Sequence, residues 1–78
     1  MDGEFKIMIA SDDEHERVFA EIYLDDKFVA LVSQERGPGE EEVELPGGGL
    51  VESLVRRKVP LRGLEKALLR AAQRLKGE

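Results

Sequence analysis

Several short stretches in the first half of this chain alternate apolar and polar residues, which is the pattern of half-buried β-strands. The clearest of them is EFKIMIAS, in which a Phe and two Ile point the same way. Two further stretches, rich in Val, Ile, Phe and Tyr, are separated only by Asp25 and Asp26, which predicts a hairpin with a two-residue turn. We therefore expect strands near residues 4–11, 17–24, 27–34 and 41–46, with a possible fifth near 54–59.

After Pro60 the repeat changes to that of an amphipathic helix, expected near residues 61–76, with Gly77 just past its end. At 100° per residue one apolar stripe forms, made of Leu61, Leu64, Leu68, Ala71, Ala72 and Leu75. The pattern as a whole predicts one α+β domain over residues 1–78. It consists of an antiparallel sheet of four to five strands packed by one C-terminal amphipathic helix.

The predicted hairpin is apolar on both of its faces. A two-residue turn pairs Tyr23 with Phe28, and paired residues share a face. One face then carries Val18, Ala20, Ile22, Val29 and Leu31, and the other carries Phe19, Tyr23, Phe28 and Val32 around Glu21 and Ala30. A single helix covers one face only, so we expect Phe19, Tyr23 and Phe28 to contact a protein partner or a second copy of the chain. The alternatives are that loops within residues 34–54 fold over this face, or that a one-residue bulge changes the assignment.

Charge is distributed unevenly along the chain. The net charge is −5, but residues 1–54 hold fifteen acidic and four basic residues, whereas residues 55–78 hold eight basic and two acidic ones. Arg62, Lys66, Arg70 and Arg74 recur at every fourth position opposite the apolar stripe and form what we call the basic ridge. The ridge and the acidic residues Glu41, Glu42 and Glu44 are candidate partner-binding groups. The alternatives are that these charges neutralise each other within the fold or face only solvent.

Motifs for catalysis or metal binding do not emerge from the sequence. The glycines at 47–49 lack the Lys and Ser or Thr of a phosphate loop and follow a run of glutamates that would repel phosphate. We therefore expect a flexible connection between strands there, with a backbone anion site as the alternative. His15 lies among acidic residues, but the run lacks the spacing of a calcium loop. No nucleophile motif surrounds the serines. We expect no catalytic residue, no metal site and no cofactor.

The cysteine content and the first residues of the chain bear on its subcellular location. The chain has no cysteine, which fits a reducing compartment, and its first residues lack the basic and apolar regions of a signal peptide. No apolar stretch is long enough to span a bilayer. We expect a cytoplasmic protein that does not associate with membranes.

Three blocks carry a resemblance: AEIYLDDKFVALVSQE, VELPGGGLVE and VRRKVPLRGLEKAL. They resemble small bacterial proteins in which such a hairpin, a short strand ending in Pro-Gly and a final amphipathic helix recur. The chain is also similar in size and charge to immunity proteins, antitoxins and phage-encoded inhibitors. This resemblance implies a non-catalytic protein-binding module of inhibitor or immunity type. The alternative is a small nucleic-acid-associated or accessory module that uses the basic helix, although the acidic net charge and the lack of aromatic residues beside the basic groups disfavour nucleic acid as a partner.

Overall fold

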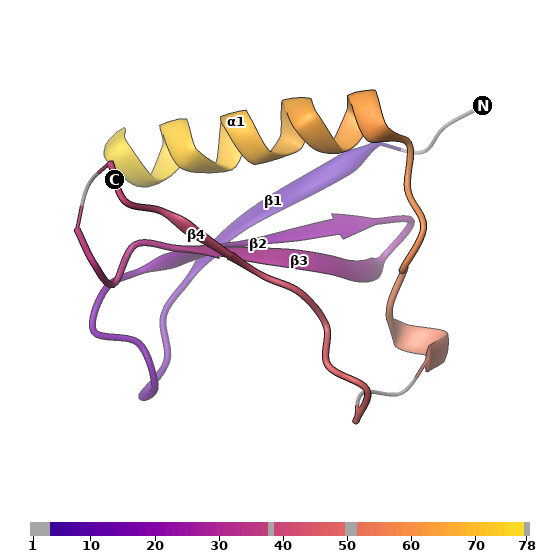
Figure 1. Cartoon of the computed structure of the whole chain (residues 1–78), viewed down its shortest axis with the longest axis horizontal. Helices are drawn as coiled ribbons and strands as arrows, with labels where there is room; N and C mark the ends of the chain where they lie inside the picture. The colour runs from indigo at the N-terminus through magenta and orange to yellow at the C-terminus, as the bar shows by residue number, and fades with distance from the viewer. Residues whose placement is uncertain (1–3, 38, 50–51, 78) are drawn as a thin grey trace.

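A four-stranded antiparallel sheet with one helix along one side forms the protein (Figure 1). The computed structural model describes residues 4–37, 39–49 and 52–77. The strands follow chain order across the sheet, and a short 3-10 turn, η1 (Glu52–Leu54), precedes the helix. The elements are β1 (Phe5–Ala10), β2 (Phe19–Leu24), β3 (Lys27–Ser33), β4 (Glu42–Glu44) and α1 (Leu61–Gly77). The predicted α+β class, with its antiparallel sheet and C-terminal helix, is confirmed.

The hairpin turn explains why β2 and β3 pair as they do near residue 25. Asp25 and Asp26 have φ angles of 54° and 64°, and two positive φ angles in succession are typical of a type I′ turn. This turn matches the twist of the two strands and fixes the first pairs, Leu24 with Lys27 and Tyr23 with Phe28, as the sequence predicts.

Beyond these two pairs the predicted register is wrong, because the pairing shifts by one residue between Ile22 and Tyr23. Ile22 pairs with Ala30 and Ala20 pairs with Val32, which leaves an extra residue in β3. Since side chains alternate along a strand, this bulge moves Leu31 to the face of Tyr23 and brings Ala30 and Val32 to the face on which α1 packs. The two hairpin faces therefore differ from the predicted ones.

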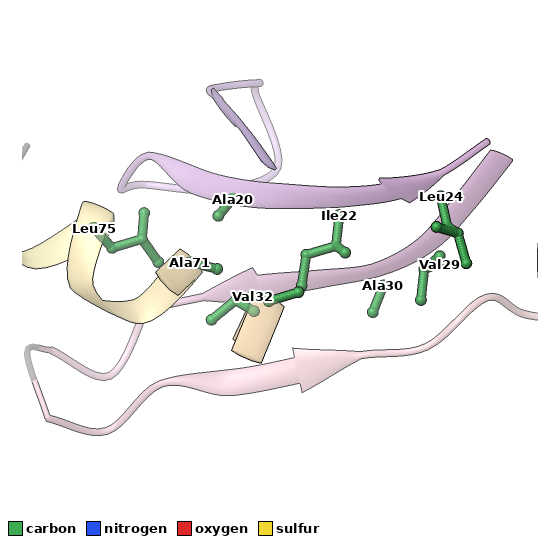
Figure 2. Close-up of a cluster of buried hydrophobic side chains, with 9 residues drawn as sticks. Ala20, Ile22, Leu24, Val29, Ala30, Val32, Ala71 and Leu75 are labelled. Atoms are coloured by element: carbon green, nitrogen blue, oxygen red, sulfur yellow. The ribbon is translucent and has the colours of Figure 1, made fainter. Parts of the chain in front are cut away.

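The core lies between α1 and one face of β2 and β3 (Figure 2). β1 contributes Phe5, Ile7 and Ile9 at its margin. The helix buries Ala67, Ala71 and Leu75, a line that only partly coincides with the predicted stripe, and Leu61 is 69% exposed. The buried residues of the cluster are Ala20, Ile22, Leu24, Val29, Ala30, Val32, Ala67, Ala71 and Leu75.

A regular fifth strand does not form in residues 52–59. Val55 makes a single parallel bridge to Phe28, and the Arg56 N–H donates to the Phe28 carbonyl oxygen at 2.8 Å. β4 is also shorter than predicted, with only three residues. The outer edge of β3 is therefore paired at both ends, by β4 and by Val55, but by different segments of the chain.

Candidate binding surfaces

The sheet face turned away from α1, which we call the open face, keeps only part of its predicted aromatic surface. Tyr23 and Phe28 lie there half-buried, with ring centroids 5.9 Å apart in an edge-to-face arrangement. Phe19, in contrast, is only 4% exposed. The prediction that all three rings face a partner is therefore wrong for Phe19, because the loop before β2 covers it.

His15 is the residue that covers Phe19. The two rings lie 4.6 Å apart, centroid to centroid, and the side chain of His15 is only 12% exposed. An Asp12 carboxylate oxygen accepts the backbone N–H groups of Glu14 and His15, at 3.0 and 2.9 Å, and so shapes this loop. The loop, and not residues 34–54, is what folds over this end of the open face.

Both ring nitrogens of His15 face carboxylates. Nδ1 lies 2.8 Å from an Asp12 oxygen and Nε2 lies 3.2 Å from a Glu44 oxygen of β4. An imidazole can donate from both nitrogens only when it is protonated. The hydrogen bonds to Asp12 and then Glu44 accordingly raise the pKa of His15 to about 9, and the bond with His15 lowers the pKa of Asp12. His15 is thus a cation that joins the loop to the sheet edge.

A second contact holds the loop before β2 in place. The Glu35 carboxylate accepts the backbone N–H groups of Glu16 and Arg17, at 2.6 and 2.9 Å, and these bonds lower the pKa of Glu35. The loop is held at both of its ends, so its position on Phe19 is part of the fold.

The rest of the open face mixes apolar and charged side chains. Met8 is 55% exposed, and Leu31 lies beside Phe28 at a shallow hollow closed by Leu45 and Pro46. By the strand register Glu21 lies on this face between Met8 and Leu31, Glu42 and Glu44 lie at its β4 edge, and Lys6 lies opposite Tyr23. Burial, and secondarily the nearby Glu21, raises the pKa of Tyr23. This surface combines the exposed Met8 and the half-buried Tyr23, Phe28 and Leu31 with three carboxylates and one lysine.

The opposite side of the sheet has an apolar groove beside the helix. α1 packs on β1 and β2, touches β3 slightly and does not reach β4. The groove that remains has a volume of about 240 Å³, and Val43 and Leu45 at its rim are 46% and 73% exposed. Its lining residues are Val29, Ala30, Val43, Leu45, Pro46, Arg56, Arg57, Val59, Leu64 and Leu68.

The two arginines at this groove already have partners. Arg56 donates to Asp25 at 2.8 Å. Arg57 binds both carboxylate oxygens of Glu52, at 3.0 and 2.8 Å, and donates to the carbonyl oxygens of Pro46 and Gly47. The pairing lowers the pKa of Glu52. Arg57 thereby holds the chain in place where the glycines at 47–49 begin. These glycines lie in the connection between β4 and η1.

The four residues of the basic ridge do not share one environment. Arg74, placed by the sequence opposite the apolar stripe, donates to the carbonyl oxygen of Ile7 in β1 at 2.7 Å and so contacts the sheet. Arg62, Lys66 and Arg70 are exposed, and within residues 4–37, 39–49 and 52–77 they make no ion pair. Lys66 and Arg70 lie on the flank of α1 nearest β1, where a hollow also contacts Glu4 and Phe5.

The three acidic candidates lie together at β4. Glu44 binds His15, Glu42 is 3.9 Å from Arg36, and Glu41 accepts the N–H of Gly39 at 2.6 Å. These contacts are all local to the sheet edge and none of them involves the basic ridge. In the described part of the chain the charge split therefore persists in three dimensions, as an acidic strand edge and a basic helix flank.

Among the described residues no cluster of three or more His, Asp or Glu side chains is placed to hold a metal ion. In the same residues no helix is both long enough and apolar enough to cross a membrane. Comparisons with protein-family models, with curated proteins and with solved structures find no match to this chain.

Proposed function

We propose that this protein is a non-catalytic protein-binding module of inhibitor or immunity type, and that the open face is its target-binding surface. The observation that carries the proposal is the apolar patch of Met8, Tyr23, Phe28 and Leu31, which lies beside a hollow and next to three glutamates. Protein interfaces are enriched in aromatic residues and Met, which this patch supplies.

The carboxylates of the open face indicate the kind of target. Glu21 lies within the patch, Glu42 lies at the β4 edge, and Glu44 extends toward His15 at the margin. A basic protein surface, such as that of an enzyme that handles nucleic acid, would be attracted by these carboxylates and bind faster at low salt. The proposed mechanism is occlusion: the module covers the basic surface that the target uses for its own ligand, in the cytoplasm that the sequence predicts.

The test compares how much target protein is captured by the wild-type module and by two variants of it. Tyr23→Glu places a charge in the apolar patch and should abolish capture, whereas Lys58→Glu changes an exposed residue outside the patch and should not. Circular dichroism of each variant verifies that it is folded. Equal capture by wild type and Tyr23→Glu would exclude the open face as the binding surface.

A second candidate function, nucleic-acid association, rests on the exposed cations Arg62, Lys66 and Arg70. It is the weaker one, because Arg56, Arg57 and Arg74 are held by contacts within the fold. Binding through a few cations should fall steeply with salt. A titration with a short labelled duplex at low salt decides the matter: no binding there rejects this function.

A further inference from the structure

The outer edge of β1 offers backbone groups to a further strand. β1 lies beneath α1 at one end of the strand order, and among the described residues it pairs with β2 alone (Figure 1). The Ile7 carbonyl oxygen accepts from Arg74 of α1 and so lies outside the β1–β2 ladder. Since backbone direction alternates along a strand, the N–H and C=O groups of Phe5 and Ile9 point the same way as those of Ile7. β1 has six residues and β4 only three, so β1 is the longer edge.

The flank of α1 above this edge is basic. Arg74 reaches Ile7, and Lys66 and Arg70 line the hollow beside the start of β1, so all three cations lie on the β1 side of the helix. The only acidic residue of α1 is Glu65. At 100° per residue Glu65 falls at least about 100° round the helix from each of the three cations. The β1 flank of α1 therefore carries positive charge without an acidic neighbour on the same helix face.

The hollow between α1 and β1 has an apolar floor and a cationic rim. Its volume is about 250 Å³, and it is lined by Glu4, Phe5, Gly63, Lys66, Ala67 and Arg70. Glu4 is its one carboxylate, and within residues 4–37, 39–49 and 52–77 it forms no ion pair with Lys66 or Arg70. Methylene groups over Phe5 and a carboxylate at the rim would complement this hollow, and a glutamate side chain supplies both.

Two other occupants fit this edge less well. Pairing of two β1 strands from two copies would bring Lys66, Arg70 and Arg74 of one copy close to the same residues of the other, and like charges repel. Nucleic acid would be attracted by the cations, but its phosphates have no N–H groups to donate to the outward carbonyl oxygens of β1. An extended acidic segment of a protein provides both the carboxylates and the backbone donors and acceptors.

We propose that the outer edge of β1 binds an extended acidic segment of a partner protein, which adds to the sheet as a further strand. Its backbone pairs with Phe5, Ile7 and Ile9. Because these residues turn their side chains toward α1, acidic residues at alternate positions of the segment would lie beside the basic flank. In strand addition the main chain gives affinity and alternate side chains give specificity.

Arg74 is compatible with this arrangement. A carbonyl oxygen has two lone pairs, so the Ile7 oxygen can accept from an incoming strand while Arg74 keeps its bond. The remaining N–H groups of the guanidinium can then donate to a carboxylate of the segment. The proposal does not depend on target binding by the open face, because it uses a different part of the sheet and a partner of opposite charge.

The first experiment is an NMR titration of the full chain with a capped peptide of alternating Val and Glu, about eight residues long and added up to about 1 mM. We expect saturable shifts and slowed hydrogen exchange at the amides of Phe5, Ile7 and Ile9. Two control peptides should not bind: one of alternating Val and Lys, and the Val–Glu peptide N-methylated on a central Val and the next Glu. Absence of shifts at β1, or equal binding by either control, would overturn the proposal.

The free protein tests the alternative occupant. If the amides of Phe5, Ile7 and Ile9 become protected from exchange as the concentration of the protein alone is raised, β1 pairs with a second copy, and the assignment of a separate partner is overturned. We expect their exchange to be independent of protein concentration.

Paired substitutions test the position of the charges. Lys66→Gln with Arg70→Gln should weaken binding of the Val–Glu peptide at least about threefold, as expected for two exposed ion pairs. Arg62→Gln with Lys76→Gln removes the same charge from exposed residues on the side of α1 away from β1, and should change the affinity less than about twofold. Equal weakening by the two pairs would mean that net charge alone attracts the peptide, which contradicts the proposed site.

Discussion

The guanidinium of Arg74 donates a hydrogen bond of 2.7 Å to the carbonyl oxygen of Ile7, across 67 residues of sequence. β1 is an edge strand, so its outward backbone groups need partners or water. Arg74 is hydrogen-bonded to one of these groups, the Ile7 carbonyl, and so connects the last turns of α1 to the sheet. At the other edge the side chain of Glu44 in β4 is bound by His15, and no side chain among the described residues bonds to the backbone of β4.

Arg74→Gln should therefore lower stability, whereas Arg70→Gln should not. Loss of one exposed, charge-assisted hydrogen bond costs about 0.5 to 1 kcal/mol. Arg70→Gln removes a charge with no hydrogen bond in the described structure, so its effect should stay within about 0.5 kcal/mol. Urea unfolding of the two variants at one protein concentration measures the difference. Equal losses would mean that the Ile7 contact contributes nothing.

Asp26→Gly should stabilise the hairpin. Asp26 has a φ of 64°, and glycine adopts positive φ without the steric cost that a side chain meets. Its ion pair with Lys6 is 3.6 Å long and highly exposed, so little is lost with it. We expect a gain of about 0.5 to 1 kcal/mol.

Asp26→Ala is the control for this prediction. It also removes the carboxylate but keeps a Cβ, so it should destabilise by about 1 kcal/mol. If thermal melts show a gain for both variants, the effect comes from the lost charge and the turn conformation does not explain it.

The turn also shows how far the sequence determines this sheet. Two consecutive Asp between apolar stretches suffice to predict the hairpin and its first two pairs, because the constraint is local. The bulge after Tyr23 is not local. It depends on Ala30 and Val32 being packed by α1 and on the outer edge of β3 being shared by β4 and Val55. Periodicity in one strand cannot reveal contacts of that range.

The candidate binding surface, too, was predicted only where it depends on local sequence. The apolar patch at Tyr23 and Phe28 follows from hairpin pairing and is retained. Phe19 was assigned wrongly because its cover, His15, comes from a loop whose shape depends on Asp12 and Glu44. A histidine within an acidic run was visible in the sequence. Its position over an aromatic ring was not, since that requires the strand register.

Gly63 should resist replacement although it lies in a helix. A Cβ built there would be 2.6 Å from Cε1 of Phe5, closer than two carbon atoms can approach. In an exposed helix position Gly→Ala usually stabilises by about 1 kcal/mol. Here the ring of Phe5 would have to move from the margin of the core, so we expect Gly63→Ala to lower the melting temperature.

The same substitution in a Phe5→Leu variant tests whether contact with the Phe5 ring causes the expected loss of stability. In Phe5→Leu the side chain is shorter, and adding Gly63→Ala to it should raise the melting temperature. This double-mutant cycle gives opposite signs only if the two residues are in contact. A stabilising Gly63→Ala in the wild-type background would show that the ring moves freely.

The pH dependence of stability should carry a contribution from His15. The pKa of His15 is about 9 in the folded protein, against 6.5 for an unperturbed histidine, because Asp12 and Glu44 stabilise the cation. A group whose pKa is raised on folding stabilises the protein fully below its unfolded pKa. This stabilisation should therefore be complete below about pH 6.5 and decline as the pH rises through 9.

Two measurements test this behaviour, and the chain has only one histidine to follow. Its ring protons in NMR spectra should titrate with a midpoint near 9. Urea unfolding at several pH values should show wild type losing stability between pH 6.5 and 9, whereas His15→Gln should lose less over the same range. The N-terminal amine also titrates in this range, but it is common to both proteins and cancels in their difference. A midpoint near 6.5, or parallel pH profiles for the two proteins, would mean that His15 is not held by Asp12 and Glu44, and the cover over Phe19 would then need another explanation.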